Sequence, residues 1–430
     1  MLKKPILLIL ALVFIAGCVN NTPKQSVQKE INVWYWMVDR RDAFEELAKN
    51  YEKETGVKVN FKLFSPDVYS QKVIAAARAG TLPEVFGILG EKKILASFVK
   101  AGYVLDLTPY MQESDNCWKN RFYPQVLEQN TFDKDNVYDV VKGIYGVPID
   151  MMNIQFLYNK DVFVQAGLDP EMPPLTFDDF IKYNKIIAEK TKTKGFACGW
   201  GEVWLINCVF TEWAMNNMGE KDFLKTLKGD IKYTDPRWIE VFELFKKLRD
   251  EQVLIPNIES TINKEAEQYF SQNKVAFSFD GSWCINIYSE LNPQLNYGVF
   301  PIPAVSNKYP VKIWGGAGSS FMISANSSLK EETVRFLNWL TETQQQKYLI
   351  KETHNLPSIK GCEEVFSDQM KEFSDDTDKI THPNVWPYEE DPMVTEALNE
   401  GLQQIVMGLK TPQQVAQDVQ EVKDRVMKRQ

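Results

Sequence analysis

The chain has 430 residues, which is more than one hydrophobic core usually accommodates, so we expect two or three domains. Hydrophobic residues make up 44% of the sequence and aromatic residues 12%, which is ample for a packed globular protein. The formal net charge of -9 argues against a nucleic-acid ligand, because such binding depends on Lys and Arg side chains that neutralise phosphates.

The N-terminus carries the pattern of an exported lipoprotein. Two lysines precede an apolar run of about twelve residues, which is shorter than the roughly twenty that span a bilayer. The run ends in Phe-Ile-Ala-Gly-Cys at residues 14–18, which resembles a bacterial lipobox. We therefore expect a signal peptide at 1–17, lipidation of Cys18 and a flexible tether at 18–30. A plain signal peptide followed by a chance cysteine is the alternative. No later stretch is long and apolar enough for a transmembrane helix.

The first part of the chain alternates between strand and helix patterns. Apolar residues predict strands at 31–37, 57–63 and 81–86, and between these strands they recur at helical spacing. Gly56 and Gly80 end two of the predicted helices. This order predicts a mainly parallel sheet with helices on both faces.

The stretch 143–163 reads as an extended crossing between two α/β units. Pro148 disfavours a helix at Val147, and residues 154–158 are rich in β-formers. Such a crossing would act as a hinge and would place Asp150 beside a cleft.

The second part repeats the alternation. Thr176 is a predicted N-cap, and a strand at 274–279 leads into Asp280 and Trp283. Another strand is expected at 297–303, and two helices close the chain, the last after Thr411 as N-cap.

The cysteine and histidine pattern does not indicate a metal or redox site. Apart from Cys18 the chain has five cysteines and no Cys-x-x-Cys, and its two histidines are far apart. A disulfide between Cys198 and Cys208 and buried free thiols both remain open. The glycines of 315–318 lack the Lys-Ser/Thr of a phosphate loop, so we expect no cofactor.

The order of several short motifs resembles the extracellular solute-binding lipoproteins of sugar-importing ABC transporters, the group that includes the maltodextrin-binding protein. These motifs extend over nearly the whole chain: the lipobox at Cys18, Trp34-x-Trp36, 80–85 (Gly-Thr-Leu-Pro-Glu-Val), 143–148 (Gly-Ile-Tyr-Gly-Val-Pro), 157–163 (Leu-Tyr-Asn-Lys-Asp-Val-Phe), Gly281-Ser282-Trp283, 297–303 and Trp314-Gly315-Gly316. Glu84 and Ser282 depart from the family, in which Asp and Pro are frequent.

The resemblance implies a two-lobed α/β fold of the type II periplasmic-binding-protein kind, with mixed sheets, helices on both faces and a hinge between the lobes. The N-lobe would take 31–146 plus 312–354, and the C-lobe 147–311 plus 355–430. The implied protein is a monomer anchored on the extracytoplasmic face of the cell membrane. It would close on a carbohydrate and deliver it to the permease subunits of the transporter, without catalysis.

A sugar site needs flat aromatic rings for the C–H faces and carboxylates or amides for the hydroxyl rim. Such groups at the ends of predicted strands are the first candidates, because ligands of open α/β sheets bind there. Asp67, which precedes a predicted helix, one loop with two indoles at 200–204 and a Pro-rich loop with Trp386 and Tyr388 add the others. Together the candidates are Trp36, Asp39, Asp67, Asp150, Trp200, Glu202, Trp204, Asp280, Trp283, Trp314, Gly315, Trp386 and Tyr388. Asp39 and Asp67 are predicted to be helix caps first and ligand contacts second, while Trp238 and Trp339 are predicted to lie in the core.

Two other functions compete with sugar binding. An exported glycosidase would use two carboxylates, which this acidic chain could supply. A binding protein for a polyamine would use the same carboxylates and aromatic rings. An anion-binding protein should show Arg or Lys at strand ends, where we find little beyond Arg40 and Arg41.

Overall fold

The computed structural model of the protein describes residues 28–90, 92–112 and 118–429. The predicted signal peptide, Cys18, most of the predicted tether and Cys117 lie outside these ranges. Within them, no helix combines the length and the apolar character needed to cross a bilayer.

In the described part of the chain, ten strands form one mixed sheet and two more form a small second sheet. The large sheet contains β1 (Glu30–Tyr35), β2 (Lys58–Leu63), β3 (Val85–Gly87), β6 (Val147–Asn159), β7 (Lys194–Ala197), β8 (Val275–Gly281), β9 (Tyr297–Phe300), β10 (Ile313–Ile323), β11 (Leu356–Pro357) and β12 (Ile380–Thr381). Its main path runs β2-β1-β3-β10-β6-β8-β7, and the small sheet pairs β4 (Thr131–Phe132) with β5 (Gly143–Ile144). The β1–β2, β1–β3 and β7–β8 pairs are parallel, whereas β10 and β6 pair antiparallel with their neighbours in the main path.

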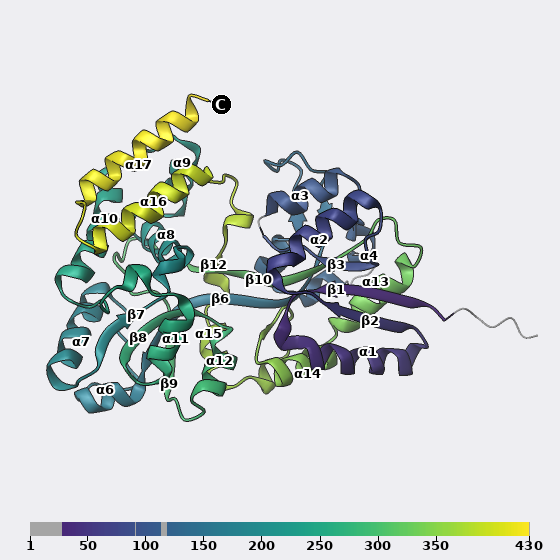
Figure 1. The fold of residues 1–430 in the computed structure, drawn as a ribbon, viewed down its shortest axis with the longest axis horizontal. Helices are drawn as coiled ribbons and strands as arrows, with labels where there is room; N and C mark the ends of the chain where they lie inside the picture. Colours follow the sequence, from purple (N-terminus) through teal and green to yellow (C-terminus); the bar gives the residue numbers. More distant parts are fainter. Residues whose placement is uncertain (1–27, 91, 113–117, 430) are drawn as a thin grey trace, which may run out of the picture.

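Figure 1 shows two lobes joined by the long strands β6 and β10. We call the part around β1–β3 the N-lobe and the part around β7–β9 the C-lobe. The N-lobe carries α1 (Arg41–Thr55), α2 (Pro66–Ala79), α3 (Lys92–Lys100), α4 (Thr108–Met111), α5 (Pro124–Glu128), α13 (Lys330–Leu340) and α14 (Thr343–Thr353). The C-lobe carries α6 (Lys160–Ala166), α7 (Phe177–Lys190), α8 (Trp204–Met218), α9 (Glu220–Lys228), α10 (Pro236–Asp250), α11 (Asn263–Ser271), α12 (Cys284–Leu291), α15 (Asp368–Ser374), α16 (Pro392–Val406) and α17 (Pro412–Met427).

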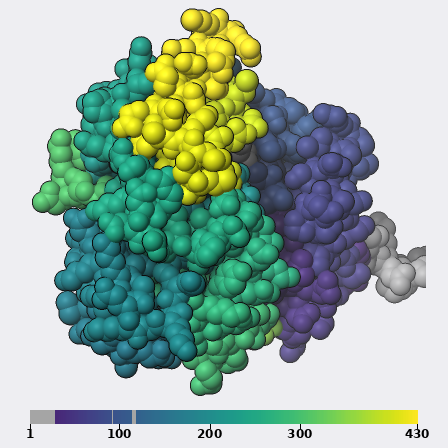
Figure 2. Space-filling model, turned by 60° about the vertical axis from the view of Figure 1, so that its left-hand side comes forward, coloured from purple at the N-terminus to yellow at the C-terminus, as the bar shows by residue number. Residues whose placement is uncertain are grey.

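Helices cover both faces of the sheet, as predicted. In Figure 1, α2 and α3 lie on one side of β1–β3, and α1 and α14 lie on the other. Figure 2 brings the C-lobe forward, with α16 and α17 in yellow packed on top of it and the N-lobe in purple and blue behind. The mixed two-lobed α/β architecture is the one that the sequence predicted.

The N-cap residues predicted from the sequence can be compared with those in the structure. The Thr176 side chain accepts a hydrogen bond from the Asp179 amide, and Thr411 forms a capping box with Gln414, so both predicted caps are confirmed. Two other caps were wrong. Asp67 lies inside the first turn of α2, which begins at Pro66, and Asp39 lies in a short 3-10 turn, η1 (Val38–Arg40), before α1.

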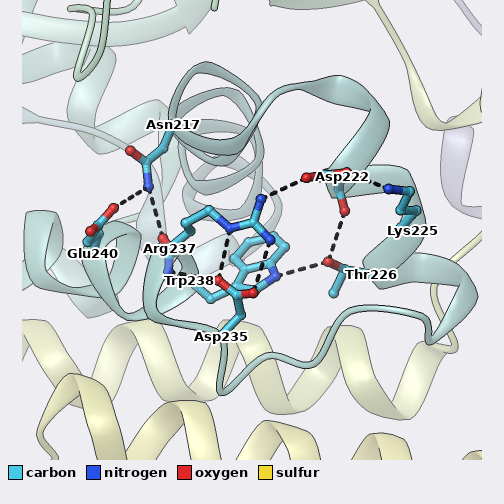
Figure 3. A network of polar contacts seen from close by, with 8 residues as sticks. All are labelled: Asn217, Asp222, Lys225, Thr226, Asp235, Arg237, Trp238 and Glu240. Atoms are coloured by element: carbon cyan, nitrogen blue, oxygen red, sulfur yellow. Dashed lines mark hydrogen bonds and ion pairs between the residues drawn. The ribbon is translucent and has the colours of Figure 1, made fainter. Parts of the chain in front are cut away.

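A half-buried polar network between α9 and α10 surrounds Trp238 and shows why this residue belongs to the core. Asp235 caps α10 and also binds the Arg237 guanidinium, which reaches Asp222 on α9 at 2.7 Å (Figure 3). The Trp238 indole N–H donates to Thr226 Oγ1 at 3.0 Å, so its one polar atom is satisfied although the side chain is fully buried. The predicted core role of Trp238 is confirmed.

Cysteines in the described ranges are free. Cys198, Cys208, Cys284 and Cys362 are all buried thiols, which settles the open choice at Cys198 and Cys208 in favour of free thiols. Burial raises the pKa of the Cys198 and Cys208 thiols well above their usual range, so both stay protonated at neutral pH. No group of three or more metal-ligating side chains occurs among the residues that the structure describes.

Candidate functional site

A buried polar contact joins the two connecting strands to the N-lobe. The first half of β6 pairs with β10, and from Ile154 onward β6 pairs with β8 in the C-lobe. Asp150 lies in the first half, where the β6–β10 register shifts around Ser319. It forms an ion pair with Arg40 and accepts hydrogen bonds from the Ser319 amide and hydroxyl, at 2.5 and 2.8 Å. Arg40 and Asp150 are each only 6% exposed, so this contact holds three separate segments together.

A large cavity opens between α8, α16 and the segment 380–391 that leads from β12 to α16. Its volume is about 860 Å³, within the range of sites for small molecules. Gly90 and Lys93 contribute from the N-lobe, so the cavity lies between the lobes. It is lined by Gly90, Lys93, Val203, Trp204, Asn207, Cys208, Phe210, Thr211, Phe223, Leu227, Tyr233, Trp238, Trp314, His382, Pro383, Asn384, Trp386, Glu389, Glu390, Pro392, Thr395, Glu396, Leu398, Asn399, Glu400 and Gln403.

Three of the predicted indoles line this cavity. Trp204 begins α8 and is 39% exposed, Trp314 lies on β10, and Trp386 follows the 3-10 turn η7 (Pro383–Val385). The Trp314 and Trp386 rings meet edge to face, with centroids 5.8 Å apart. The Trp386 indole N–H donates to Thr381 Oγ1 at 2.7 Å, and this bond holds the ring in place. Residues far apart in the chain thus present aromatic surface to one space.

A smaller cavity of about 100 Å³ adjoins the large one, because Gly90 and Asn384 line both. It contains Trp36 together with polar side chains from α3, β10 and the segment after α5: Lys92, Gln129, Asn130, Ser319 and Ser320. Gly87 is required here, because a Cβ atom at that position would lie 2.2 Å from the Trp36 ring. Gly316 has φ +155°, and the side-chain amide of Gln129 occupies the space that a side chain at position 316 would need. The N-lobe therefore offers one aromatic ring and several polar groups.

The segment 380–391 is fixed to the C-lobe and also touches the N-lobe. Glu390 accepts hydrogen bonds from Tyr233 on one side and from the buried Lys423 of α17 on the other, at 2.7 and 2.6 Å. Toward the N-lobe, the Asn384 side chain accepts a hydrogen bond from the backbone amide of Lys92 on α3 at 3.1 Å. Glu389 accepts one from the Tyr138 hydroxyl. These two bonds bridge the lobes beside the cavity.

The remaining predicted site residues line neither cavity. Trp200 is fully buried and packs against Phe196 and Phe245, so it belongs to the C-lobe core. Asp150 joins the connecting strands, and Gly315 is buried against the Met152 backbone. Four others lie elsewhere. The Asp39 carboxylate accepts a hydrogen bond from the Asn355 side chain, and Asp67 is exposed on α2. Glu202 accepts a hydrogen bond from the backbone amide of Asn263, and the Lys228 ammonium lies over the Tyr388 ring.

Asp280 and Trp283 form a group of their own beside Trp204. The Trp283 ring lies 5.8 Å from that of Trp204, so it supports the cavity wall without lining it. Asp280 is fully buried and accepts hydrogen bonds from the Gly281 amide and from Tyr288. Asn263 bridges Asp280 and Glu267 at 3.2 and 3.0 Å. Burial raises the pKa of both carboxyls, and the negative charge of Asp280 adds to the effect at Glu267.

A comparison with known families identifies the chain. The family described as "Bacterial extracellular solute-binding protein" matches residues 37–347, well over half of the sequence. The chain belongs to this family. This solute-binding protein is 23% identical over 347 residues to the multiple sugar-binding protein of Streptococcus mutans, which covers 78% of this chain and 77% of the relative. It is 24% identical over 372 residues to the melibiose/raffinose/stachyose-binding protein MelE of Bacillus subtilis, with 81% and 79% covered.

The fold is shared with solved structures of such proteins. RafE of Streptococcus pneumoniae in its apo form superposes with a TM-score of 0.74 at 20% identity, over 92% of this chain and 97% of that one. The family and both relatives are named as binding proteins, so this chain is a binding protein rather than an enzyme, as predicted.

Several polar residues of the solute-binding protein's cavity were not predicted. Asn399 and Gln403 lie on α16, which was predicted only as a helix with an apolar face, and Asn207 lies on α8, which was not predicted as a helix. Glu212 is almost fully buried behind Trp314, and its carboxylate accepts a hydrogen bond from the backbone amide of Trp314 at 2.5 Å. Burial raises the pKa of Glu212 well above its usual range. His382 was considered only as a metal ligand. The Pro-rich character of 383–392 was the one signal in the sequence, and it led only to Trp386 and Tyr388.

Lys92 gives the N-lobe side of the site a buried cation. Its ammonium donates to the Glu128 carbonyl at 3.0 Å and lies 5.0 Å from the centre of the Phe132 ring. Burial lowers the pKa of Lys92 to about 8, against the opposing effect of the nearby Glu128 and Asp133 charges. Lys92 is therefore still mostly protonated at neutral pH.

Proposed function

We propose that this protein is the lipid-anchored substrate-binding component of an ABC importer, and that it captures a carbohydrate of oligosaccharide size between its lobes. The observation that carries the proposal is the convergence of Trp204, Trp314 and Trp386 on one inter-lobe cavity of about 860 Å³. Indole rings bury the C–H faces of a sugar, and the carboxylates and amides around them pair with its hydroxyls. Two of the similar proteins bind sugars according to their names, which supports the same ligand class here.

The proposed mechanism is closure of the two lobes about β6 and β10. In our proposal the N-lobe comprises 31–146 and 312–354, and the C-lobe 147–311 and 355–430. Trp36 and the polar groups of the smaller cavity would then close over a sugar held by the indoles of the large cavity, and the closed form would be presented to the permease. Micromolar binding needs only about 8 kcal/mol, which a few stacked rings and charged hydrogen bonds supply after ordering costs.

The ligand class is tested with the mature chain, residues 18–430, by thermal shift followed by calorimetry. The sugar probes are melibiose, raffinose, stachyose, maltotriose and chitotriose, each with a one-to-one stoichiometry expected for a hit. A raised melting temperature and a measurable heat with at least one of them support the proposal. Absence of binding to all five contradicts an oligosaccharide ligand.

A polyamine is the second candidate, because carboxylates outnumber cations around the cavity. Glu389, Glu390, Glu396 and Glu400 line it, against Lys93 as the one ammonium among its described lining residues. Spermidine is therefore included as a probe at low and at high salt. Binding of spermidine that survives 0.5 M NaCl, with no response to any sugar, would replace the carbohydrate with a polyamine.

Lipid anchoring rests on the sequence pattern at Cys18 and needs its own experiment. Expression of the full chain in a bacterial host with a radiolabelled fatty acid should label the wild type and leave Cys18→Ser unlabelled. A Cys362→Ser variant, which removes a buried thiol instead, is the matched control and should keep the label. Equal labelling of wild type and Cys18→Ser would contradict the proposed anchor.

A further inference from the structure

His382 lies where the cavity meets the connecting strands. It directly follows β12, in which Thr381 pairs with Trp314 of β10. Its ring contacts the Trp314 indole edge to face, with centroids 5.6 Å apart, and it lines the large cavity. The imidazole is therefore placed at the edge of the surface on which we propose that a sugar ring stacks.

The hydrogen bonding of the ring defines its proton positions. The backbone amide of Asn384 donates a hydrogen bond to His382 Nδ1 at 3.1 Å, so Nδ1 must be the unprotonated acceptor. A neutral imidazole with an acceptor at Nδ1 carries its proton on Nε2. Burial, with the nearby Lys92 charge as a second cause, lowers the pKa of His382 to about 4, so the ring is neutral at neutral pH.

The Nε2–H group is left for another partner. Within residues 28–90, 92–112 and 118–429 no group forms a hydrogen bond with His382 Nε2, although the ring is only partly exposed. Around the cavity, the carboxylate oxygens of Glu389, Glu396 and Glu400 serve as hydrogen-bond acceptors. A neutral donor beside Trp314 would complement them, because sugar oxygens also need donors.

We propose that His382 is a specificity-determining residue of this site, and that its Nε2–H donates to an oxygen of the sugar that stacks beside Trp314. The inference rests on the proposed function for its ligand class. The donor itself is defined by contacts within the protein, so the two can be tested separately.

Two substitutions separate the two ring nitrogens. In His382→Asn the side-chain oxygen can still accept from the Asn384 amide, but the distal donor is lost. In His382→Gln the amide nitrogen reaches about as far as Nε2 and can still donate. Calorimetry with raffinose, or with whichever of melibiose, stachyose, maltotriose and chitotriose binds the wild type, should show about tenfold weaker binding for His382→Asn and less than threefold for His382→Gln.

His354→Asn is the matched control, since His354 ends α14 with φ +52°, which Asn tolerates, and lines neither cavity. It should bind as the wild type does. Equal affinity of His382→Asn and wild type for the same sugar would overturn the proposal, as would a loss in His382→Gln as large as that in His382→Asn.

A second readout needs no sugar. The chain has two histidines, so ¹⁵N-histidine labelling of the mature protein gives two pairs of ring signals, and His354→Asn leaves only those of His382. At pH 7 they should show a neutral ring protonated at Nε2. A ring protonated at Nδ1, or a charged ring, would overturn the inference. If none of the five sugars binds the wild type, it is the proposed function that fails, and the ring signals alone then decide whether the donor exists.

Discussion

Trp200 and Trp204 are four residues apart and have opposite environments. Trp200 is fully buried, whereas Trp204 is 39% exposed at the cavity. The turn between them passes through Val203, whose φ of +58° is rare for a β-branched residue and costs of order 1–3 kcal/mol. The sequence could assign both indoles to one loop, but the turn that separates them depends on this unusual backbone conformation.

This pair provides a matched test of the aromatic wall. We expect Trp204→Ala to weaken binding of raffinose, or of the sugar that the screen identifies, by at least tenfold with little change in stability. Trp200→Ala should instead lower the free energy of unfolding by about 3–5 kcal/mol, because it empties a packed core site. Calorimetry and urea unfolding of both variants give the comparison. A Trp204→Ala variant that binds normally would remove this indole from the site.

The buried carboxyls of the Asp280 group predict a pH dependence of stability. Burial raises the pKa of Asp280 to about 7 and that of Glu267 to about 8. The folded protein therefore keeps protons that the unfolded chain releases above about pH 4. By linkage, the free energy of unfolding falls as pH rises from about 4 to about 8, with a slope of up to about 1.4 kcal/mol per pH unit for each group.

Urea unfolding at pH 5, 6, 7 and 8 tests the sign. Asp280→Asn keeps the shape of the side chain without its charge, so its stability should fall less steeply over this range than that of the wild type. Asp222→Asn is the control, because Lys225 and Arg237 lower the pKa of Asp222 and any effect of its titration lies below this range. Parallel curves for Asp280→Asn and wild type would contradict the assignment.

The long strand β6 shows what could be predicted about an element and what could not. Pro148 and the β-rich residues after it predicted an extended crossing within 143–163, and β6 spans Val147–Asn159. The partners of Asp150 could not be predicted, because Arg40 and Ser319 are 110 and 169 residues away in the chain. Local pattern defines a strand, but its buried polar partners depend on the tertiary fold.

The Arg40–Asp150 pair should therefore matter more for stability than an exposed pair does. Asp150→Asn removes the buried partner of Arg40 and leaves the more exposed Asp39, 3.5 Å away, as its remaining carboxylate. Removing the buried partner of an ion pair typically costs about 3–5 kcal/mol, and we expect a loss toward the lower end of this range. The double variant Arg40→Met with Asp150→Asn should recover much of this loss, since both charges are then absent. Urea unfolding measures both variants. Glu46→Gln, which removes the exposed partner of Lys49, should cost less than about 1 kcal/mol. A loss in Asp150→Asn no larger than this would contradict the structural role.

For the molecule as a whole, the order of motifs along the chain was enough to predict two lobes and the family, because each motif belongs to a local strand, turn or helix start. The cavity required more. It combines residues of α8, β10, the segment 380–391, α16 and the N-lobe residues Gly90 and Lys93. Which faces of these elements meet depends on how the lobes are placed relative to each other, and no local pattern contains that information.

The bridging contacts beside the cavity lead to a prediction about lobe closure. Glu389 belongs to a segment that Glu390 ties to the C-lobe, and it accepts a hydrogen bond from Tyr138 of the N-lobe. This bond stabilises the arrangement in which the lobes touch. Tyr138→Phe should therefore shift the sugar-free protein toward more open forms and raise the apparent dissociation constant for raffinose, or the identified sugar, by up to about tenfold.

Small-angle scattering and calorimetry test this together. The radius of gyration of sugar-free Tyr138→Phe should exceed that of the wild type, and saturating sugar should bring the two together, because the ligand supplies the closing contacts that the hydroxyl no longer does. Tyr110→Phe is the matched control: its hydroxyl also donates to a glutamate, Glu331 at 3.1 Å, but α4 and α13, which carry the two residues, both belong to the N-lobe. If Tyr138→Phe and Tyr110→Phe are alike in both measurements, the Tyr138–Glu389 bond has no part in closure, and the lobe equilibrium must then be set by the Lys92–Asn384 bond and the connecting strands.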